Sequence, residues 1–173
     1  GRGAFYRITP SLQVKTLLTG VGNANGLDWD VERKLFYFND TPTLRTDVFT
    51  FDAAGGTIGN RRLVRRYAET EGNPDGMTLD ADGGLWVALW GHGRVVCLEP
   101  DTGRIVREIR LPVSNVASCA FAGEDLRDLV ITTAAHGTSL REEPLAGALF
   151  RIRVGASGRP PYQFDDREGS QCD

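Results

Sequence analysis

The chain has 173 residues, of which 40% are hydrophobic and 25% are charged, an ordinary composition for one soluble domain or at most two small ones. Its formal net charge of −3 argues against a general nucleic-acid binder and against a protein that binds membrane surfaces. No apolar run approaches the roughly 18 residues of a membrane span, and the first residues carry no signal-peptide pattern. We therefore expect a cytoplasmic protein.

Turns and short strands dominate the sequence. Glycine accounts for 21 residues, which favours tight turns over helices, and helical periodicity is nearly absent. Short runs rich in β-branched and aromatic residues recur, bounded by Gly, Asp or Pro, and each predicts a strand. In chain order these runs are Ala4–Ile8, Lys34–Phe38, Asp47–Phe51, Gly84–Leu89, Arg94–Leu98, Arg104–Ile109, Leu129–Thr132 and Ala148–Ile152.

A repeat organises these strands. The segment Asn25–Asp30 is echoed 50 residues later by Asp75–Asp80, and a degenerate third copy, Ala117–Ala122, follows after a further 42 residues. Each copy opens a unit of four strands, and a four-stranded unit of about 40–50 residues is typical of a propeller blade. Only two strands precede the first copy, so the chain holds about three and a half blades, whereas closed rings typically have about 4–8. The sequence predicts an all-β, partial β-propeller.

The predicted propeller blades extend over residues 1–164. Residues 165–173 carry no apolar anchor and are expected to be a disordered tail. The first residue is Gly1 and the only methionine is Met77, which fits a chain that begins in the middle of a blade. We expect the missing N-terminal blades, or another copy of the chain, to be needed to close the ring.

Two polar residues hold the same position in successive repeats. Asn25 and Asp75 each precede a glycine on the strand expected to be innermost in its blade. Because the innermost strands line the channel of a propeller, both side chains should point into the same volume. Carboxylate and amide oxygens suit a hard divalent cation such as Ca²⁺, Mg²⁺ or Mn²⁺.

These motifs resemble those of the regucalcin (senescence marker protein), gluconolactonase-like family. The resemblance begins with Asn-Gly-Leu-Asp-Trp at 25–29 and Pro-Asp-Gly-Met at 74–77, and it runs in order from about Gly3 to about Tyr162. It covers nearly the whole chain but begins about midway along the length of the family. The flanking segments that match are Asn60–Arg62, Leu85–Ala88, Gly93–Val96, Asp101–Arg104 and Leu111–Val113.

The resemblance implies a six-bladed propeller with one divalent metal ion, Ca²⁺, Zn²⁺, Mn²⁺ or Mg²⁺, that opens sugar lactones. It assigns metal binding to Asn25 and Asp75, and it makes Asp75 the general base. The third protein ligand of the family, a glutamate, and its substrate-contacting arginine and asparagine have no counterpart in this chain. We expect a metal-dependent lactonase that lacks its N-terminal ligands. The alternative is a non-catalytic propeller that binds calcium or serves as a scaffold.

Other motifs favour structural roles. The segments Asp28–Asp30 and Asp80–Gly83 lack the Gly and Glu that an EF-hand needs at its sixth and twelfth positions, so we interpret their aspartates as hairpin-turn residues. His92 and His136 lack a nucleophile motif and are expected in loops. Trp90 stands at a strand end, where it could stack on a sugar.

The basic cluster and the cysteines are also interpreted structurally. Arg61–Arg66 follows a Gly-Gly turn, where the outermost, charged edge strand of a blade belongs. Trp29 and Trp86 lie within strand patterns and are expected in the core between blades. The three cysteines form no Cys-x-x-Cys motif, which excludes a zinc ribbon, and their odd number favours a reducing compartment.

Overall fold

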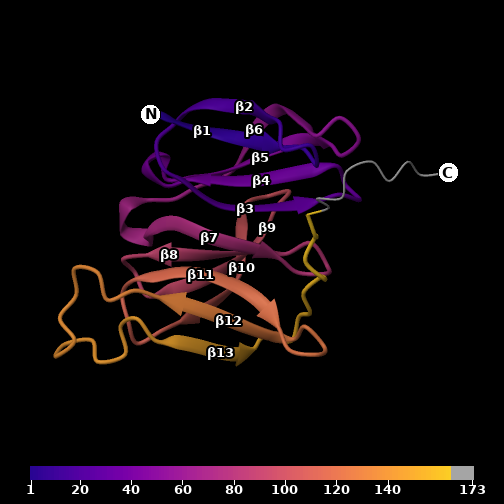
Figure 1. Ribbon diagram of the computed structural model, residues 1–173. Coiled ribbons are helices and arrows are strands. Elements are labelled where there is room, and N and C mark those ends of the chain that lie inside the picture. Colours follow the sequence, from indigo (N-terminus) through magenta and orange to yellow (C-terminus); the bar gives the residue numbers. More distant parts are fainter. Residues whose placement is uncertain (165–173) are drawn as a thin grey trace.

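The computed structural model describes residues 1–164 and consists almost entirely of antiparallel strands (Figure 1). The described part contains thirteen strands and two short 3-10 helices, and no α-helix. The prediction of a disordered tail at 165–173 lies outside the described residues. The strands are β1 (Gly3–Ile8), β2 (Val14–Val21), β3 (Ala24–Asp30), β4 (Leu35–Asp40), β5 (Arg45–Asp52), β6 (Thr57–Arg66), β7 (Asn73–Leu79), β8 (Leu85–Trp90), β9 (Arg94–Glu99), β10 (Arg104–Arg110), β11 (Val116–Ala122), β12 (Asp128–Thr133) and β13 (Leu149–Arg153). The 3-10 helices are η1 (Thr41–Thr43) and η2 (Glu69–Glu71).

The strands form four sheets that follow the chain. The orders are β1-β2, β3-β4-β5-β6, β7-β8-β9-β10 and β11-β12-β13, and each strand pairs with the next in sequence. Figure 1 shows the sheets stacked one after another, with β3, β7 and β11 at corresponding places. Two complete four-stranded blades are thus flanked by an outer pair of strands and by a three-stranded sheet. The prediction of a partial propeller is confirmed.

Apolar side chains fill the spaces between sheets. The strand β8 lies in the β7–β10 sheet and is buried on both faces. Its residues Leu85–Leu89 are therefore all at most 1% exposed and show no alternation with polar residues. One buried cluster, which includes Tyr37, Val87 and Leu89, joins the β3–β6 sheet to the β7–β10 sheet. A second cluster, around Trp86, joins the β7–β10 sheet to the last one. These clusters hold neighbouring blades together.

The inner strands β3, β7 and β11 approach one another so closely that glycine is required between them. A Cβ atom at Gly26 would overlap the carbonyl of Asp75 and lie 2.8 Å from the main-chain nitrogen of Met77. A Cβ atom at Gly76 would overlap the side chain of Ser118 and lie 2.7 Å from its Cα. The glycine after each candidate site residue therefore permits adjacent blades to pack.

The C-terminal segment after β13 runs back across all the larger sheets (Figure 1). The Gly158 amide donates to the carbonyl of Leu126 at 2.7 Å, and the Ala81 amide donates to the carbonyl of Ser157 at 2.7 Å. Arg159 Nη2 then reaches the carbonyl of Trp29 at 3.0 Å. This segment ties three successive blades together.

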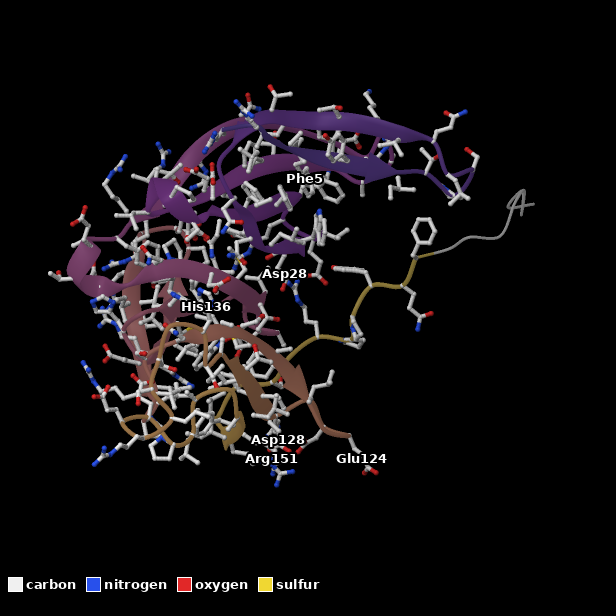
Figure 2. All side chains as sticks on the ribbon, turned by 60° about the vertical axis from the view of Figure 1, so that its left-hand side comes forward. Phe5, Asp28, Glu124, Asp128, His136 and Arg151 are labelled. Carbon is white, nitrogen blue, oxygen red and sulfur yellow. The ribbon has the colours of Figure 1, made fainter. Side chains whose placement is uncertain are left out.

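The two outermost sheets present different surfaces. Tyr6, Ile8 and Val14 leave the first sheet largely exposed and apolar, and each of these residues is 54–64% accessible. On the last sheet, Asp128 lies beside Arg151 at 3.8 Å (Figure 2). Within the described residues, no helix is long and apolar enough to span a membrane.

Candidate functional site

The two predicted site residues lie on matching irregularities of neighbouring inner strands. The pairing of β3 with β4 shifts register between Ala24 and Leu27, and the pairing of β7 with β8 shifts between Pro74 and Met77. Asn25 and Asp75 each fall inside such a bulge. A bulge re-aims a side chain and is common beside active sites. The repeated sequence thus gives both residues the same unusual backbone position, as the repeat predicted.

Thr41 connects the two strands at this point. Asn25 Nδ2 donates to Thr41 Oγ1 at 3.0 Å, and Thr41 Oγ1 donates to the carbonyl of Pro74 at 2.8 Å. Asn25 and Asp75 are both half-buried. The asparagine of the first complete blade is therefore linked, through one hydroxyl group, to the residue that precedes the aspartate of the next blade.

A second polar contact holds the main chain of Asp75. Asn39 is fully buried, and its Nδ2 donates to the carbonyl of Asp75 at 2.8 Å. The Thr46 hydroxyl donates to Asn39 Oδ1 at 2.7 Å and lies 3.0 Å from the hydroxyl of Tyr67. This buried network satisfies each polar group and fixes β7 relative to β4. The sequence interpretation missed Thr41 and Asn39, because Asn39 lies on β4 and Thr41 in η1, outside the repeated motif.

The carboxyl group of Asp75 has a raised pKa. Partial burial raises it, while a hydrogen bond from the Asn25 side chain and one from the Gly76 main chain act in the opposite direction. A carboxylate that has lost part of its hydration gains more from a nearby cation than an exposed one does. Asp75 is thus suited either to hold a cation or to accept a proton.

The oxygen atoms at this site fit part of the coordination sphere of a hard divalent cation. The carboxylate of Asp75 and the Oδ1 atom of Asn25 are the donors that Ca²⁺, Mg²⁺ or Mn²⁺ prefer. Among residues 1–164, no three His, Cys, Asp or Glu side chains lie close enough to form a metal site. A complete coordination sphere therefore needs donors in addition to these two.

The opposite end of the inner strands holds an aspartate in a different role. Asp28 Oδ2 accepts the Leu79 amide at 2.6 Å, and Oδ1 accepts the Trp29 amide at 2.7 Å. Burial raises the pKa of Asp28, although these hydrogen bonds oppose the increase. Figure 2 shows Asp28 between the ribbons, and the residue lines a cavity of about 550 Å³ that the C-terminal segment helps to enclose.

This position corrects one interpretation from the sequence. Asp28 belongs to the interior of β3 and bridges to β7, so its assignment to a hairpin turn was wrong. Its neighbour Asp30 does cap the turn, since its Oδ1 accepts the Arg33 amide at 3.0 Å. Asp80 also behaves as predicted, because its carboxylate accepts the Gly84 amide at 2.7 Å. Asp28 in the strand and Asp30 at the turn belong to the same short motif, so the motif alone does not distinguish their positions.

The remaining candidates lie where the sequence predicted. His92 and His136 are exposed in loops, and His136 contributes only its carbonyl, which accepts Asn115 Nδ2 at 2.7 Å. Arg61–Arg66 lies on β6, the outermost strand of its sheet. Trp86 is buried in the core, and Trp90 is half-buried at the end of β8.

Comparison with known proteins adds an independent line of support. Residues 1–135 match the family described as SMP-30/Gluconolactonase/LRE-like region. The chain is 39% identical over 167 residues to regucalcin of Oryctolagus cuniculus, and the alignment covers 94% of this chain and 56% of that protein. The chain therefore spans little more than half the length of the curated relatives it matches.

Solved structures agree with this match. A calcium-binding protein, regucalcin of Agrobacterium tumefaciens, superimposes with a TM-score of 0.86 and 26% identity, over 95% of this chain and 57% of that one. A luciferin-regenerating enzyme superimposes with a TM-score of 0.83 and 28% identity, over 90% and 53% of the two chains. The resemblance seen in the motifs at 25–29 and 74–77 is thereby confirmed, and the chain belongs to the SMP-30/gluconolactonase/LRE-like family.

Proposed function

We propose that this chain is part of a metal-dependent hydrolase that opens sugar lactones, with Asn25 and Asp75 as ligands of one divalent cation. The observation that carries the proposal is the equivalent bulge position of these two residues on adjacent inner strands, in a chain that belongs to the gluconolactonase-like family. Both side chains supply oxygen donors, and Thr41 links their strands at that point.

In the proposed reaction Asp75 acts as the general base. It accepts a proton from a water molecule whose oxygen adds to the lactone carbonyl carbon, the ring C–O bond then breaks, and the released ring oxygen takes up a proton to give the hydroxy acid. Burial raises the pKa of Asp75, which makes it a stronger base than an exposed aspartate. When bound, the cation would polarise the carbonyl and stabilise the developing oxyanion.

The two oxygen donors found among residues 1–164 leave the rest of the site to be supplied by other residues. We propose that the missing N-terminal blades, or another copy of the chain, close the ring and add the remaining ligands and the groups that contact the lactone. The two-stranded and three-stranded outer sheets support this view, because each is incomplete beside the four-stranded ones. We also propose a cytoplasmic location, which the free thiols of Cys97 and Cys119 support.

The test is hydrolysis of glucono-1,5-lactone by the protein that contains these residues, measured with Ca²⁺, Zn²⁺, Mn²⁺ or Mg²⁺. Asp75→Ala should lower kcat by about 100-fold or more, since both a base and a metal ligand are lost. Asp101→Asn, which changes an exposed aspartate in the turn between β9 and β10, is the matched control and should leave turnover unchanged. Undiminished turnover by Asp75→Ala would refute the assignment.

The alternative is a propeller that binds calcium or serves as a scaffold without catalysis. The small number of donors among residues 1–164 favours it, because two oxygen ligands can hold a cation loosely without positioning a substrate. Calorimetric titration separates the candidates. A scaffold should bind neither metal nor lactone, a calcium-binding propeller should bind only the metal, and the hydrolase should bind the metal and turn over the lactone.

A further inference from the structure

Thr41 makes three hydrogen bonds to residues of, or next to, the inner strands β3 and β7. It is the first residue of η1, directly after β4, and its main-chain N–H donates to the carbonyl of Asn23 at 3.2 Å. Its hydroxyl group accepts from Asn25 Nδ2 at 3.0 Å and donates to the Pro74 carbonyl at 2.8 Å. Thr41 thus bonds to Asn25 itself and to main-chain carbonyl groups just before Asn25 and just before Asp75.

The polarity of these bonds determines how the Asn25 amide is turned. A threonine hydroxyl has one proton, and the Pro74 carbonyl can only accept, so that proton is committed to Pro74. The hydroxyl must then accept from its other neighbour, which requires the NH₂ group of Asn25 to face Thr41. The same NH₂ group also donates to the carboxyl group of Asp75, so the carbonyl oxygen of the amide, Oδ1, is directed away from Thr41 and is free to bind a cation.

Asn39 holds the main-chain carbonyl of Asp75, and a neighbouring hydroxyl group fixes the orientation of its amide in the same way. The Thr46 hydroxyl donates to Asn39 Oδ1 at 2.7 Å, so Asn39 presents its NH₂ group to the Asp75 carbonyl at 2.8 Å. Two successive carbonyl groups of β7, at Pro74 and Asp75, are thus held by side chains of the preceding blade. The second contact anchors the backbone, whereas the contact through Thr41 also orients a ligand.

The contacts of Asn39 and Thr41 with the next blade do not recur at the following interface between blades. The strand pairings align β4 with β8 at an offset of 49 residues, which places Ala88 and Trp90 in the next blade where Asn39 and Thr41 stand in the first. Ala88 is fully buried in an apolar cluster, and Trp90 has no hydroxyl group. Blades of this chain therefore pack without such a link. The link occurs only where the two candidate ligands meet, which points to a role in the site rather than in packing.

We propose that Thr41 is a positioning residue that turns the Asn25 carboxamide so that its oxygen faces the cation held jointly with Asp75. This inference rests on the proposed function, because it assumes that Asn25 and Asp75 bind a cation. Outer contacts that orient metal ligands typically change metal affinity by about 10–100-fold when removed. The hydroxyl group of Thr41, rather than its methyl group, carries the effect.

The experiment compares Thr41→Val and Thr41→Ser with the wild-type chain. Mn²⁺ alone is titrated and followed by the loss of free-ion electron paramagnetic resonance signal, with no lactone present. Thr41→Val keeps the shape but lacks the hydroxyl group, and it should weaken Mn²⁺ binding by about tenfold or more. Thr41→Ser keeps the hydroxyl group and should bind within about threefold of wild type. Equal affinity in Thr41→Val, or failure of Thr41→Ser to bind normally, would overturn the proposal.

Two controls separate positioning from stability. Thr132→Val removes an exposed hydroxyl group from β12, far along the chain from the site, and should leave Mn²⁺ affinity unchanged. Melting temperatures are measured with chelator present, so that each variant is compared in its metal-free state. The proposal requires the loss of Mn²⁺ affinity in Thr41→Val to persist at temperatures where that variant remains fully folded.

A failure of the proposed function gives a different result. If the wild-type chain binds no Mn²⁺, the metal assignment fails for this chain, and the orientation of Asn25 is decided by nuclear magnetic resonance of the metal-free protein. One Hδ2 proton of Asn25 should exchange slowly and shift downfield in the wild type and in Thr41→Ser, and it should lose both properties in Thr41→Val. Identical Asn25 amide signals in wild type and Thr41→Val would refute the positioning role.

Discussion

The interface between β3 and β7 differs from the interface between β7 and β11, although both join successive copies of the same repeat. Both have an apolar core behind the inner strands. At the first interface, Asn39 and Thr41 cross from one blade to the main chain of the next. At the second interface, the corresponding positions 88 and 90 are Ala and Trp, and a thiol, Cys119, lies against the carbonyl of Trp86.

Blade packing and site formation are therefore separable. Apolar burial and close glycine contacts are sufficient to join the second pair of blades. The first pair carries additional hydrogen bonds, which are short, directional and satisfied on both sides. Directional contacts fix side-chain orientation, which apolar contacts do much less well. We therefore expect changes at the first interface to alter the site, and changes at the second interface to alter stability alone.

The largest expected effect concerns the apolar second interface. Burial raises the pKa of the Cys97 and Cys119 thiols to about 12. At pH 8 the thiolate fraction should be about a thousandfold below that of an unfolded thiol. In a Cys172→Ser background, both thiols should therefore react with Ellman's reagent about a thousandfold more slowly in the folded protein than in urea.

The same shift gives a dependence of stability on pH. Unfolded thiols ionise near pH 9, whereas the buried ones stay neutral until about pH 12. The unfolded state thus binds fewer protons in this window, so the free energy of unfolding should fall as the pH rises above about 9. Labelling of the folded protein within tenfold of the unfolded rate would contradict the apolar description of this interface.

The next effect compares equivalent buried positions in the two blades. Ala88→Asn places an amide in the apolar cluster of the second interface and should lower the free energy of unfolding by about 3–5 kcal/mol. Asn39→Leu removes the side-chain donor to the Asp75 carbonyl and leaves the Thr46 hydroxyl with only the Tyr67 hydroxyl as a partner, which should cost about 2–3 kcal/mol. Urea denaturation measures both.

Only Asn39→Leu should also weaken Mn²⁺ binding under conditions where the variant is folded. Equal loss of metal affinity in Ala88→Asn would show that the two interfaces are not separable. Stability unchanged by Asn39→Leu would show that the buried amide is not needed to anchor β7.

Much of this comparison could be predicted from the sequence, but the orienting contacts could not. The repeat at an offset of 50 residues identified β3 and β7, and it placed Asn25 and Asp75 in equivalent positions. Thr41 and Asn39 belong to the end of β4 and η1, and their partners lie 33 and 36 residues away on another blade. Nothing in a single sequence marks such a contact, because a polar residue at a strand end is usually solvated.

Asp28 and the C-terminal segment show the same limit. The position of Asp28 between an inner strand and its neighbour depends on how the blades pack, whereas the turn aspartates depend on local sequence alone. The segment after β13 lacks the alternating pattern of a strand, so its course across three blades follows from tertiary contacts. Local pattern predicts blades, and packing between blades determines which polar residues meet.

A smaller effect tests the close approach of the inner strands. Gly26→Ala and Gly76→Ala should each cost about 1–3 kcal/mol, because a methyl group is forced against the neighbouring blade. At Gly76 the obstacle is largely the side chain of Ser118, whereas at Gly26 it is the main chain of β7. The double variant Gly76→Ala with Ser118→Gly should therefore recover part of the lost stability in urea denaturation. No recovery would show that the Ser118 main chain, rather than its side chain, limits the approach.

The smallest effect concerns the C-terminal segment at the end of the channel away from Asn25 and Asp75. Arg159 is 26% exposed, donates to the Trp29 carbonyl at 3.0 Å and lies 3.8 Å from Asp30 Oδ1. Arg159→Ala should cost about 1 kcal/mol in urea denaturation, since a partly buried, charge-assisted hydrogen bond is lost. The matched control is Arg104→Ala, whose ion pair with Glu99 is well exposed and should contribute at most about 0.5 kcal/mol.

Salt separates the two contributions of Arg159. Screening weakens its attraction to Asp30 but leaves the hydrogen bond to a neutral carbonyl largely intact, so most of the loss should remain at 1 M NaCl. Because the segment also bonds to Ala81 and Leu126, the remaining contacts keep it attached, and Mn²⁺ affinity at Asn25 and Asp75 should be unchanged. A change in metal affinity would show that the two ends of the inner strands are coupled, and the separation between packing and site formation would then fail.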